Sequence, residues 1–211
     1  SITLERKDDG FSYSINPFIN NISDFIVIEP VSTNNTIRGT FQVWEYRQTN
    51  AQLLGLDLNA SYVFSEAMHF NHQLSVVKGR DRTQDESLIN MPPINTTNEI
   101  VYYNSKFRNL RLSLQSEYVF KQNEFPNTDF EVYIPNTESL EIVEVSSPPP
   151  AYHLLNFNST IDFDFSARST LTLGFQVTNL LNVSYRNYLN RMRLFADDLG
   201  RNFLLNIKLK Y

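Results

Sequence analysis

The stretch LGLDLNASYVF, residues 54–64, decides the fold. Its even-numbered positions are apolar or aromatic, and its odd-numbered positions, apart from Val63, are small or polar. Because successive side chains of a strand point to opposite faces of a sheet, this period of two predicts a β-strand with one apolar and one polar face. With eleven residues, the strand is long enough to cross the hydrocarbon layer of a membrane at a tilt.

The same alternation recurs along most of the chain. It is found, more or less clearly, at residues 11–28, 70–78, 94–102, 110–120, 155–165, 171–178 and 203–211. No stretch shows the period of about 3.6 residues that marks an amphipathic helix. We therefore expect an all-β protein of about eight antiparallel strands.

The expected connections alternate between short and long. The short turns lie at residues 65–68, 104–109 and 166–169, and the long loops at about 30–38, 79–92, 121–150 and 184–200. Aromatic residues gather where strands reach the short turns: Tyr62, Phe64, Phe70, Tyr102, Tyr103, Phe163, Phe165 and Tyr211. Short turns at one end, long loops at the other and an aromatic girdle are typical of an up-and-down transmembrane β-barrel.

Alternation by itself leaves other architectures open. A soluble lipocalin-like barrel or a β-sandwich has the same pattern with its apolar face turned inward. A complete eight-stranded membrane barrel is a further alternative, but its narrow interior must be filled by side chains. Gly55, Asn59 and Ser61 on the polar face are small, which favours one wall of a wider barrel.

Composition narrows the class of protein further. The 211 residues include no cysteine, and 18 Lys and Arg against 23 Asp and Glu give a formal charge of −5. Without cysteine there is no disulfide scaffold, thiolate metal site or cysteine nucleophile. The acidic balance speaks against a nucleic-acid partner, because such a protein needs a basic face to neutralise phosphates.

The sequence shows no catalytic constellation. It has no phosphate-binding glycine loop, no nucleophile-elbow motif and no zinc-peptidase motif. His69 and His72 lie three residues apart in an expected strand, so they point to opposite faces and cannot share a metal. We therefore expect no enzyme activity and neither a cofactor nor a metal site.

The tail VTNLLNVSYRNYLNRMRLFADDLGRNFLLNIKLKY, residues 177–211, resembles the C-terminal signature of TonB-dependent outer-membrane receptors. In that family an Asn-Leu-aromatic-Asn turn and a Tyr precede the last strand. The corresponding positions here are 179–182 and Tyr185, with Leu181 in place of the aromatic residue. The runs YRNY, residues 185–188, and ADDLGR, residues 196–201, are similar to segments of receptors from the Bacteroidota. Further segments resemble other strands of the family's barrel, namely residues 50–64, 91–103 and 150–163.

The resemblance implies a 22-stranded barrel that surrounds an N-terminal plug domain. We expect residues 1–211 to be the C-terminal portion of such a barrel, with the plug domain absent from this chain. The implied location is the outer membrane of a Gram-negative bacterium, with outer-membrane lipid, the TonB system and the plug domain as partners. The implied function is TonB-dependent uptake of a scarce nutrient. The resemblance favours a ferric siderophore or another metal complex as that nutrient, so the expected ligand is a metal chelate. The alternative is a soluble or complete small β-barrel that binds an apolar ligand.

Two sets of residues are candidates for functional roles. The resemblance makes the last strand the signal that the barrel-assembly machinery reads, through Phe203, Leu205, Ile207, Leu209 and Tyr211. The last loop carries Arg186, Arg191 and Arg193, which we expect to contact an anionic metal chelate, or else to pair with nearby aspartates or with lipopolysaccharide phosphates. Another loop is acidic, with Glu124, Asp129, Glu131, Glu138, Glu141 and Glu144, and forms either an acidic mouth for a cation or a solvated surface.

Overall fold

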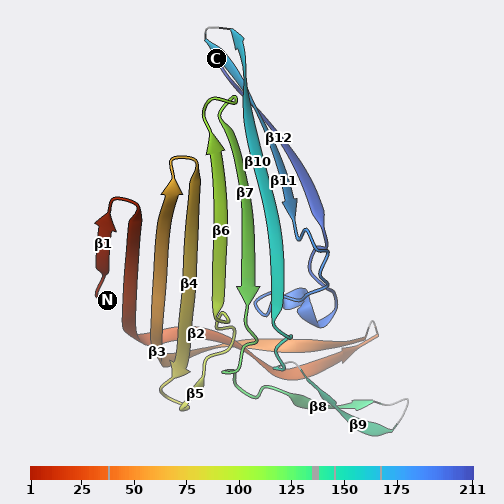
Figure 1. Cartoon of the computed structure of the whole chain (residues 1–211). Coiled ribbons are helices and arrows are strands. Elements are labelled where there is room, and N and C mark those ends of the chain that lie inside the picture. The colour runs from red at the N-terminus through yellow and green to blue at the C-terminus, as the bar shows by residue number, and fades with distance from the viewer. Residues whose placement is uncertain (38, 135–137, 145, 167) are drawn as a thin grey trace.

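The chain forms one open, curved wall of antiparallel strands (Figure 1). The structure is a computed structural model, and it describes residues 1–37, 39–134, 138–144, 146–166 and 168–211. A four-residue 3-10 helix, η1 (Arg191–Leu194), lies in the last long loop. No helix in the described part of the chain is long and apolar enough to cross a membrane.

Nine strands follow one another across the wall, each antiparallel to the next, in the order β1-β2-β3-β4-β6-β7-β10-β11-β12. Their bounds are β1 (Leu4–Asp8), β2 (Phe11–Thr36), β3 (Gly39–Ser65), β4 (Met68–Asp81), β6 (Asn95–Asn104), β7 (Leu110–Val119), β10 (Tyr152–Ser166), β11 (Ser169–Thr178) and β12 (Asn202–Lys210). The short strand β5 (Glu86–Ser87) pairs with β4, and β8 (Phe130–Ile134) pairs with β9 (Ser139–Val143) in a separate hairpin. The expected antiparallel meander is confirmed, and β1 is one short strand more than expected.

The strand register confirms that the apolar residues share one face. Leu58 of β3 stands opposite Leu74 of β4, and Leu173 of β11 stands opposite Ile207 of β12. Residues directly opposite each other in an antiparallel pair point to the same side. Large apolar side chains on this face, such as Leu114, remain exposed. A continuous uncovered apolar face of this kind is what a lipid-facing surface requires.

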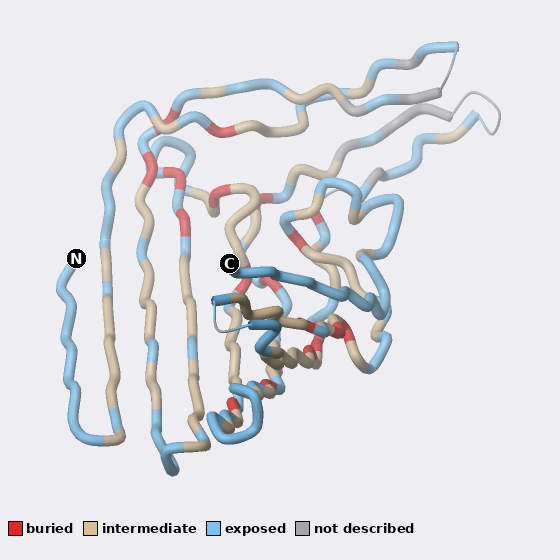
Figure 2. Tube along the Cα trace, turned by 90° about the horizontal axis from the view of Figure 1, so that it is seen from above, coloured by how far each residue is buried: buried red, intermediate tan, exposed pale blue. Residues whose placement is uncertain are grey.

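The wall is not closed on itself. β1 and β12 lie at its two edges, and each pairs with a single neighbour. Seen from above, the strands follow an arc that leaves the two edges apart (Figure 2). This is the geometry of a section of a large barrel.

The largest departure from the expected layout is a long hairpin formed by β2 and β3. A loop was expected at about residues 30–38, but pairing continues until Thr36 stands opposite Gly39. Arg38 lies outside the described residues. A bulge between Ile22 and Phe25, with Asp24 at a φ of 55°, interrupts the register. Because bulges bend and twist a hairpin, the distal part, residues 23–49, turns across the loop end of the wall (Figure 1). We call this part the β2–β3 arm.

Two small apolar clusters pack the base of the loops. Val27 of the arm, Ala51 of β3 and Leu88 after β5 form one cluster. The second joins β7 and β10 to the last loop and consists of Val119, Tyr152, Leu154, Val183 and Tyr185. The loop end is therefore attached to the wall by buried apolar contacts, whereas the lipid-facing side is left uncovered.

Candidate ligand-facing site at the loop end

The β2–β3 arm is fastened to the wall by one buried carboxylate. Asp81, the last residue of β4, is only 1% exposed. It accepts hydrogen bonds from Thr49 Oγ1 at 2.6 Å and from Arg47 Nη2 at 2.9 Å, both on β3. The backbone N–H groups of Thr83 and Gln84 donate to it as well, at 2.8 and 3.0 Å. We call this set of five residues the Asp81 clasp.

The hydrogen bonds of the clasp also fix the charge on Asp81. Burial by itself would raise the pKa of this carboxyl group, but donation from Thr49, Gln84 and Arg47 outweighs that effect and lowers the pKa to about 2. Arg47 makes a second ion pair, with Glu29 across the arm, at 2.9 Å. The arm is therefore held at its base by charge-assisted bonds that lie beyond the apolar face of the wall.

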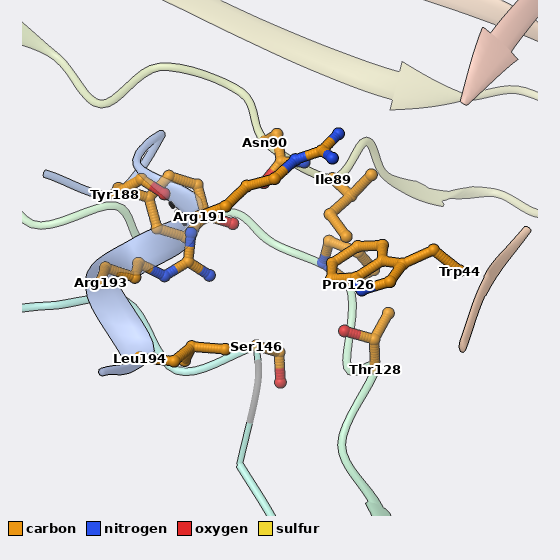
Figure 3. A pocket seen from close by; sticks show the side chains of 10 residues that line it. All are labelled: Trp44, Ile89, Asn90, Pro126, Thr128, Ser146, Tyr188, Arg191, Arg193 and Leu194. Atoms are coloured by element: carbon orange, nitrogen blue, oxygen red, sulfur yellow. Dashed lines mark hydrogen bonds between the residues drawn. The ribbon is translucent and has the colours of Figure 1, made fainter. Parts of the chain in front are cut away.

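Further out, the arm meets the last loop at a small crevice (Figure 3). Tyr188, Arg193 and Leu194 of the last loop lie on one side, and Trp44 of the arm lies on the other. The remaining lining residues are Ile89, Asn90, Pro126, Thr128, Ser146 and Arg191. The crevice holds about 30 Å³, which is room for little more than a water molecule. It is therefore too small to enclose a metal chelate.

Arg191 joins the two sides of this crevice. Its guanidinium carbon lies 5.8 Å from the centre of the Trp44 ring, within the range of a cation–π contact. Arg191 is exposed, and in the described part of the chain it makes no ion pair with a carboxylate. Its charge is therefore available to an anionic group at the mouth of the wall.

Arg193 has a different role, although it lines the same crevice. Its guanidinium lies 4.3 Å from the centre of the Tyr188 ring and donates to the backbone oxygen of Tyr188. Tyr188 is 3% exposed. Burial lowers the pKa of Arg193, and it raises the pKa of the Tyr188 hydroxyl. Arg193 therefore supports the loop from within, with a stacked, buried aromatic partner.

Arg186 does not reach the crevice. Its Nε donates to Asp197 Oδ1 at 2.6 Å, and its Nη1 donates to the backbone oxygen of Arg193 at 2.7 Å. These are bonds within the last loop. The structure thus brings Arg191 and Arg193 together at the crevice. Arg186 instead pairs with an aspartate of its own loop, which is one of the alternatives expected for these arginines.

The carboxylates of the acidic loop do not gather into one negatively charged cluster. Glu124 pairs with Lys78, and Asp129 Oδ1 accepts from both the backbone N–H and the hydroxyl of Ser146. Other carboxylates of the loop are exposed, namely Glu131, Glu138, Glu141 and Glu144. Within the described residues, no three metal-ligating side chains of the kind supplied by His, Asp or Glu come together.

The opposite face of the wall carries rows of polar side chains. Ser61 donates to Asn71 at 2.8 Å, and Asn71 donates to Glu99 at 3.2 Å, which links β3, β4 and β6. Asn156 of β10 donates to Gln115 of β7 at 3.1 Å. Since each of these bonds crosses from one strand to the next on the face away from lipid, this face suits contact with water or with polar protein.

The C-terminal candidates lie together on the lipid-facing side of β12. Phe203, Leu205, Ile207 and Leu209 stand opposite apolar residues of β11, and the Phe203 ring stacks on Phe175 with centroids 6.3 Å apart. All five side chains of the candidate assembly signal are exposed: Phe203, Leu205, Ile207, Leu209 and Tyr211. Their arrangement on one face is as expected, and their role in assembly remains a prediction.

A wall with one apolar and one polar face, short turns at one end and packed loops at the other belongs to an outer-membrane β-barrel. The chain belongs to the family of TonB-dependent receptor-like β-barrels, whose family model matches residues 2–180. Members of this family are outer-membrane proteins of Gram-negative bacteria, and they are transporters, not enzymes. A sequence comparison with curated proteins found no match.

Solved structures show the same fold at low sequence identity. The copper transporter OprC has a TM-score of 0.72 and 16% identity, over 99% of this chain and 30% of that one. The FrpB iron transporter from Neisseria meningitidis has a TM-score of 0.65 and 16% identity, over 98% and 30%. The siderophore receptor PirA from Acinetobacter baumannii has a TM-score of 0.62 and 17% identity, over 99% and 30%. The chain therefore spans about 30% of the length of these three structures.

Proposed function

We propose that residues 1–211 are the C-terminal portion of the barrel of a TonB-dependent receptor that takes up a scarce nutrient across the outer membrane. The observation that carries this proposal is the family match over residues 2–180. A wall with one uncovered apolar face and one polar face supports it, because such a wall separates lipid from a wet interior. In this proposal the plug domain and the TonB system are partners of the complete receptor, and the polar face of the wall receives the plug.

The nutrient we propose is an anionic metal chelate, such as a ferric siderophore. Support comes from Arg191 and Trp44, which together offer an exposed cation and a flat aromatic surface at the loop end. A guanidinium binds carboxylates and other planar anionic groups through paired hydrogen bonds. Among proteins of similar structure, FrpB is described as an iron transporter, PirA as a siderophore receptor and OprC as a copper transporter.

The test uses the complete receptor in the cells that produce it. Deleting its gene is expected to abolish growth on one metal chelate as the sole source of that metal, within a panel of ferric siderophores and copper complexes. Growth of the deletion strain on every member of the panel would overturn the proposal. Recovery of the receptor in a soluble fraction, folded without detergent, would do the same.

Two variants then test the loop-end site. Arg191→Ala and Trp44→Ala are each expected to weaken binding of the chelate to whole cells by about tenfold, which is the size of a charge-assisted or stacking contact. Arg168→Ala removes an exposed arginine from the short-turn end and is the matched control, with no change expected. Unchanged binding in both test variants would remove this site from the receptor's ligand-binding surface.

A further inference from the structure

Four polar side chains lie together on the lipid-facing side of the wall. His72 of β4, Asn98 of β6 and Ser116 of β7 stand opposite one another, in one row across three adjacent strands. His153 of β10 lies in the next row towards the loop end. Residues directly opposite each other share a face, and alternation puts His72 on the same face as Leu74, so all four face lipid. We call them the polar patch.

Apolar residues border the polar patch on both sides. The next row towards the short turns is formed by Phe70, Ile100, Leu114 and Phe157. Towards the loops lie Ile94 and Phe120, where the backbone N–H of Phe120 donates to the backbone oxygen of Ile94 at 2.9 Å. On β6, Asn98 lies midway in sequence between Ile94 and Tyr102. The patch therefore lies within the hydrocarbon-facing band and not at its edge.

The hydrogen bonds within the patch leave one donor and one acceptor open at its centre. His72 Nδ1 donates to Asn98 Oδ1 at 2.8 Å, and Ser116 Oγ is hydrogen-bonded to His153 Nε2 at 2.8 Å. Because an amide oxygen only accepts, Nδ1 carries the proton in neutral His72, and its Nε2 is then an acceptor. In the described part of the chain, neither this Nε2 nor the amide nitrogen of Asn98 is hydrogen-bonded.

An open donor and an open acceptor are unfavourable against lipid tails. The hydrocarbon layer has no hydrogen-bonding group, so a polar side chain exposed to it loses the bonds that water would provide. Between transmembrane helices, such side chains hydrogen-bond across the contact instead. All four side chains of the patch are at least partly exposed. A protein surface with a donor and an acceptor at the same depth would satisfy them.

We propose that the polar patch is the contact between two copies of this receptor in the outer membrane. Both copies have the same orientation in the membrane, so the two-fold axis that relates them lies along the membrane normal, and each depth of one copy meets the same depth of the other. The Asn98 amide of each copy then donates to His72 Nε2 of the other. A patch with one donor and one acceptor at its centre is self-complementary, and this selects a second copy as the partner. A single buried asparagine likewise fixes the register of coiled-coil dimers.

The experiment is disulfide cross-linking of the complete receptor in outer membranes, after any cysteine outside residues 1–211 has been replaced by Ser. Ile100→Cys places a thiol beside Asn98 on the same face of β6. Leu173→Cys places one on the lipid-facing side of β11 and is the control. Oxidation is expected to link about fivefold more of the Ile100→Cys receptor than of the Leu173→Cys receptor. The linked product should have twice the mass of the receptor.

A second substitution tests the hydrogen bonds of the patch. Asn98→Val, combined with Ile100→Cys, replaces the amide by a side chain that lipid tolerates. The unfolding temperature of the barrel should therefore stay at or above that of the Ile100→Cys receptor, while cross-linking falls by about fivefold. Ser159→Val changes a lipid-facing residue of β10 outside the patch and is the matched control, with no change in cross-linking expected.

Three results would overturn the inference. The first is equal cross-linking of the two single-cysteine variants, and the second is cross-linking that survives Asn98→Val. The third is a linked product whose mass is not twice that of the receptor, because it would identify a different membrane protein as the partner. None of these results bears on the proposed uptake function, which is tested by growth on the chelate.

Discussion

Thr49 Oγ1 of β3 donates a 2.6 Å hydrogen bond to Asp81 Oδ1 at the end of β4, and both residues are buried. This contact lies at the point where the β2–β3 arm leaves the wall. Arg47 adds a charged donor to the same carboxylate, so one side chain carries the bonds that set the direction of the arm. Trp44, three residues before Arg47 on β3, lies on the arm that this contact fastens.

Replacing Asp81 by Ala is expected to release the arm. Removing one partner of a buried, hydrogen-bonded ion pair is strongly destabilising, and here Arg47 keeps Glu29 as a second partner, so the cost is about 2 kcal/mol for local opening. Limited proteolysis of the receptor in outer membranes measures this, as faster cleavage within residues 23–49. Asp85→Asn, an exposed carboxylate on the neighbouring loop, is the control. Unchanged cleavage of the Asp81→Ala variant would show that the arm is held by other contacts.

The clasp also predicts how the arm responds to acid. The pKa of Asp81 is about 2 in the folded arm, against 3.8 for the free side chain. A carboxyl group whose pKa is lowered by folding contributes stability above its free pKa and loses it as the pH falls through the folded value. Cleavage of the arm by pepsin should therefore increase between about pH 4 and pH 2. In the Asp81→Asn variant the arm should be cleaved faster at pH 4 already, with a weaker dependence on pH across this range.

The wall could be predicted from sequence because its physical signal is local. Each strand alternates on its own, as in Leu54 to Phe64, and the short turn between β3 and β4 then sets the register that places Leu58 opposite Leu74. The arm was not predicted, because bulges after Ile22 and after Pro30 shift the alternation between faces. When the two-residue alternation moves from one face to the other twice within a segment, the segment lacks the continuous pattern of a strand. Its sequence then resembles that of a loop.

The contacts at the loop end could not be predicted for a different reason. Trp44 and Arg191 meet only because the arm bends across the wall and the last loop folds back to it. Alternation assigns side chains to faces but does not say which loops touch. One sequence signal was present at the clasp: in the run KGRDR, residues 78–82, Asp81 falls on the opposite face from the three cations. This alternation predicts that Asp81 and the three cations have separate roles.

Gly55 is expected to tolerate no side chain, although it lies in a regular strand. A Cβ at this position would collide with the Phe18 ring and come within 2.8 Å of the backbone oxygen of Val76. Gly55→Val should therefore lower the free energy of unfolding by about 1–3 kcal/mol, the cost of overpacking. Gly174→Ala is the matched control, because the nearest atom to its Cβ would be Asn206 Cβ at 3.3 Å. Urea unfolding of the two variants in detergent measures the difference, and equal midpoints would contradict the prediction.

Tyr211 and Phe203 offer a way to separate assembly from stability. Tyr211 is 97% exposed, so Tyr211→Asp removes little packing. If the apolar row of β12 is read during assembly, this variant should reach the outer membrane at a severalfold lower level, with an unchanged unfolding temperature in the molecules that do assemble. Phe203→Ala also loses the stacking on Phe175, so it should lower both the level and the unfolding temperature. Lys210→Gln, which alters the opposite face of the same strand, should change neither. A wild-type level of the Tyr211→Asp variant would show that this residue is not part of the signal.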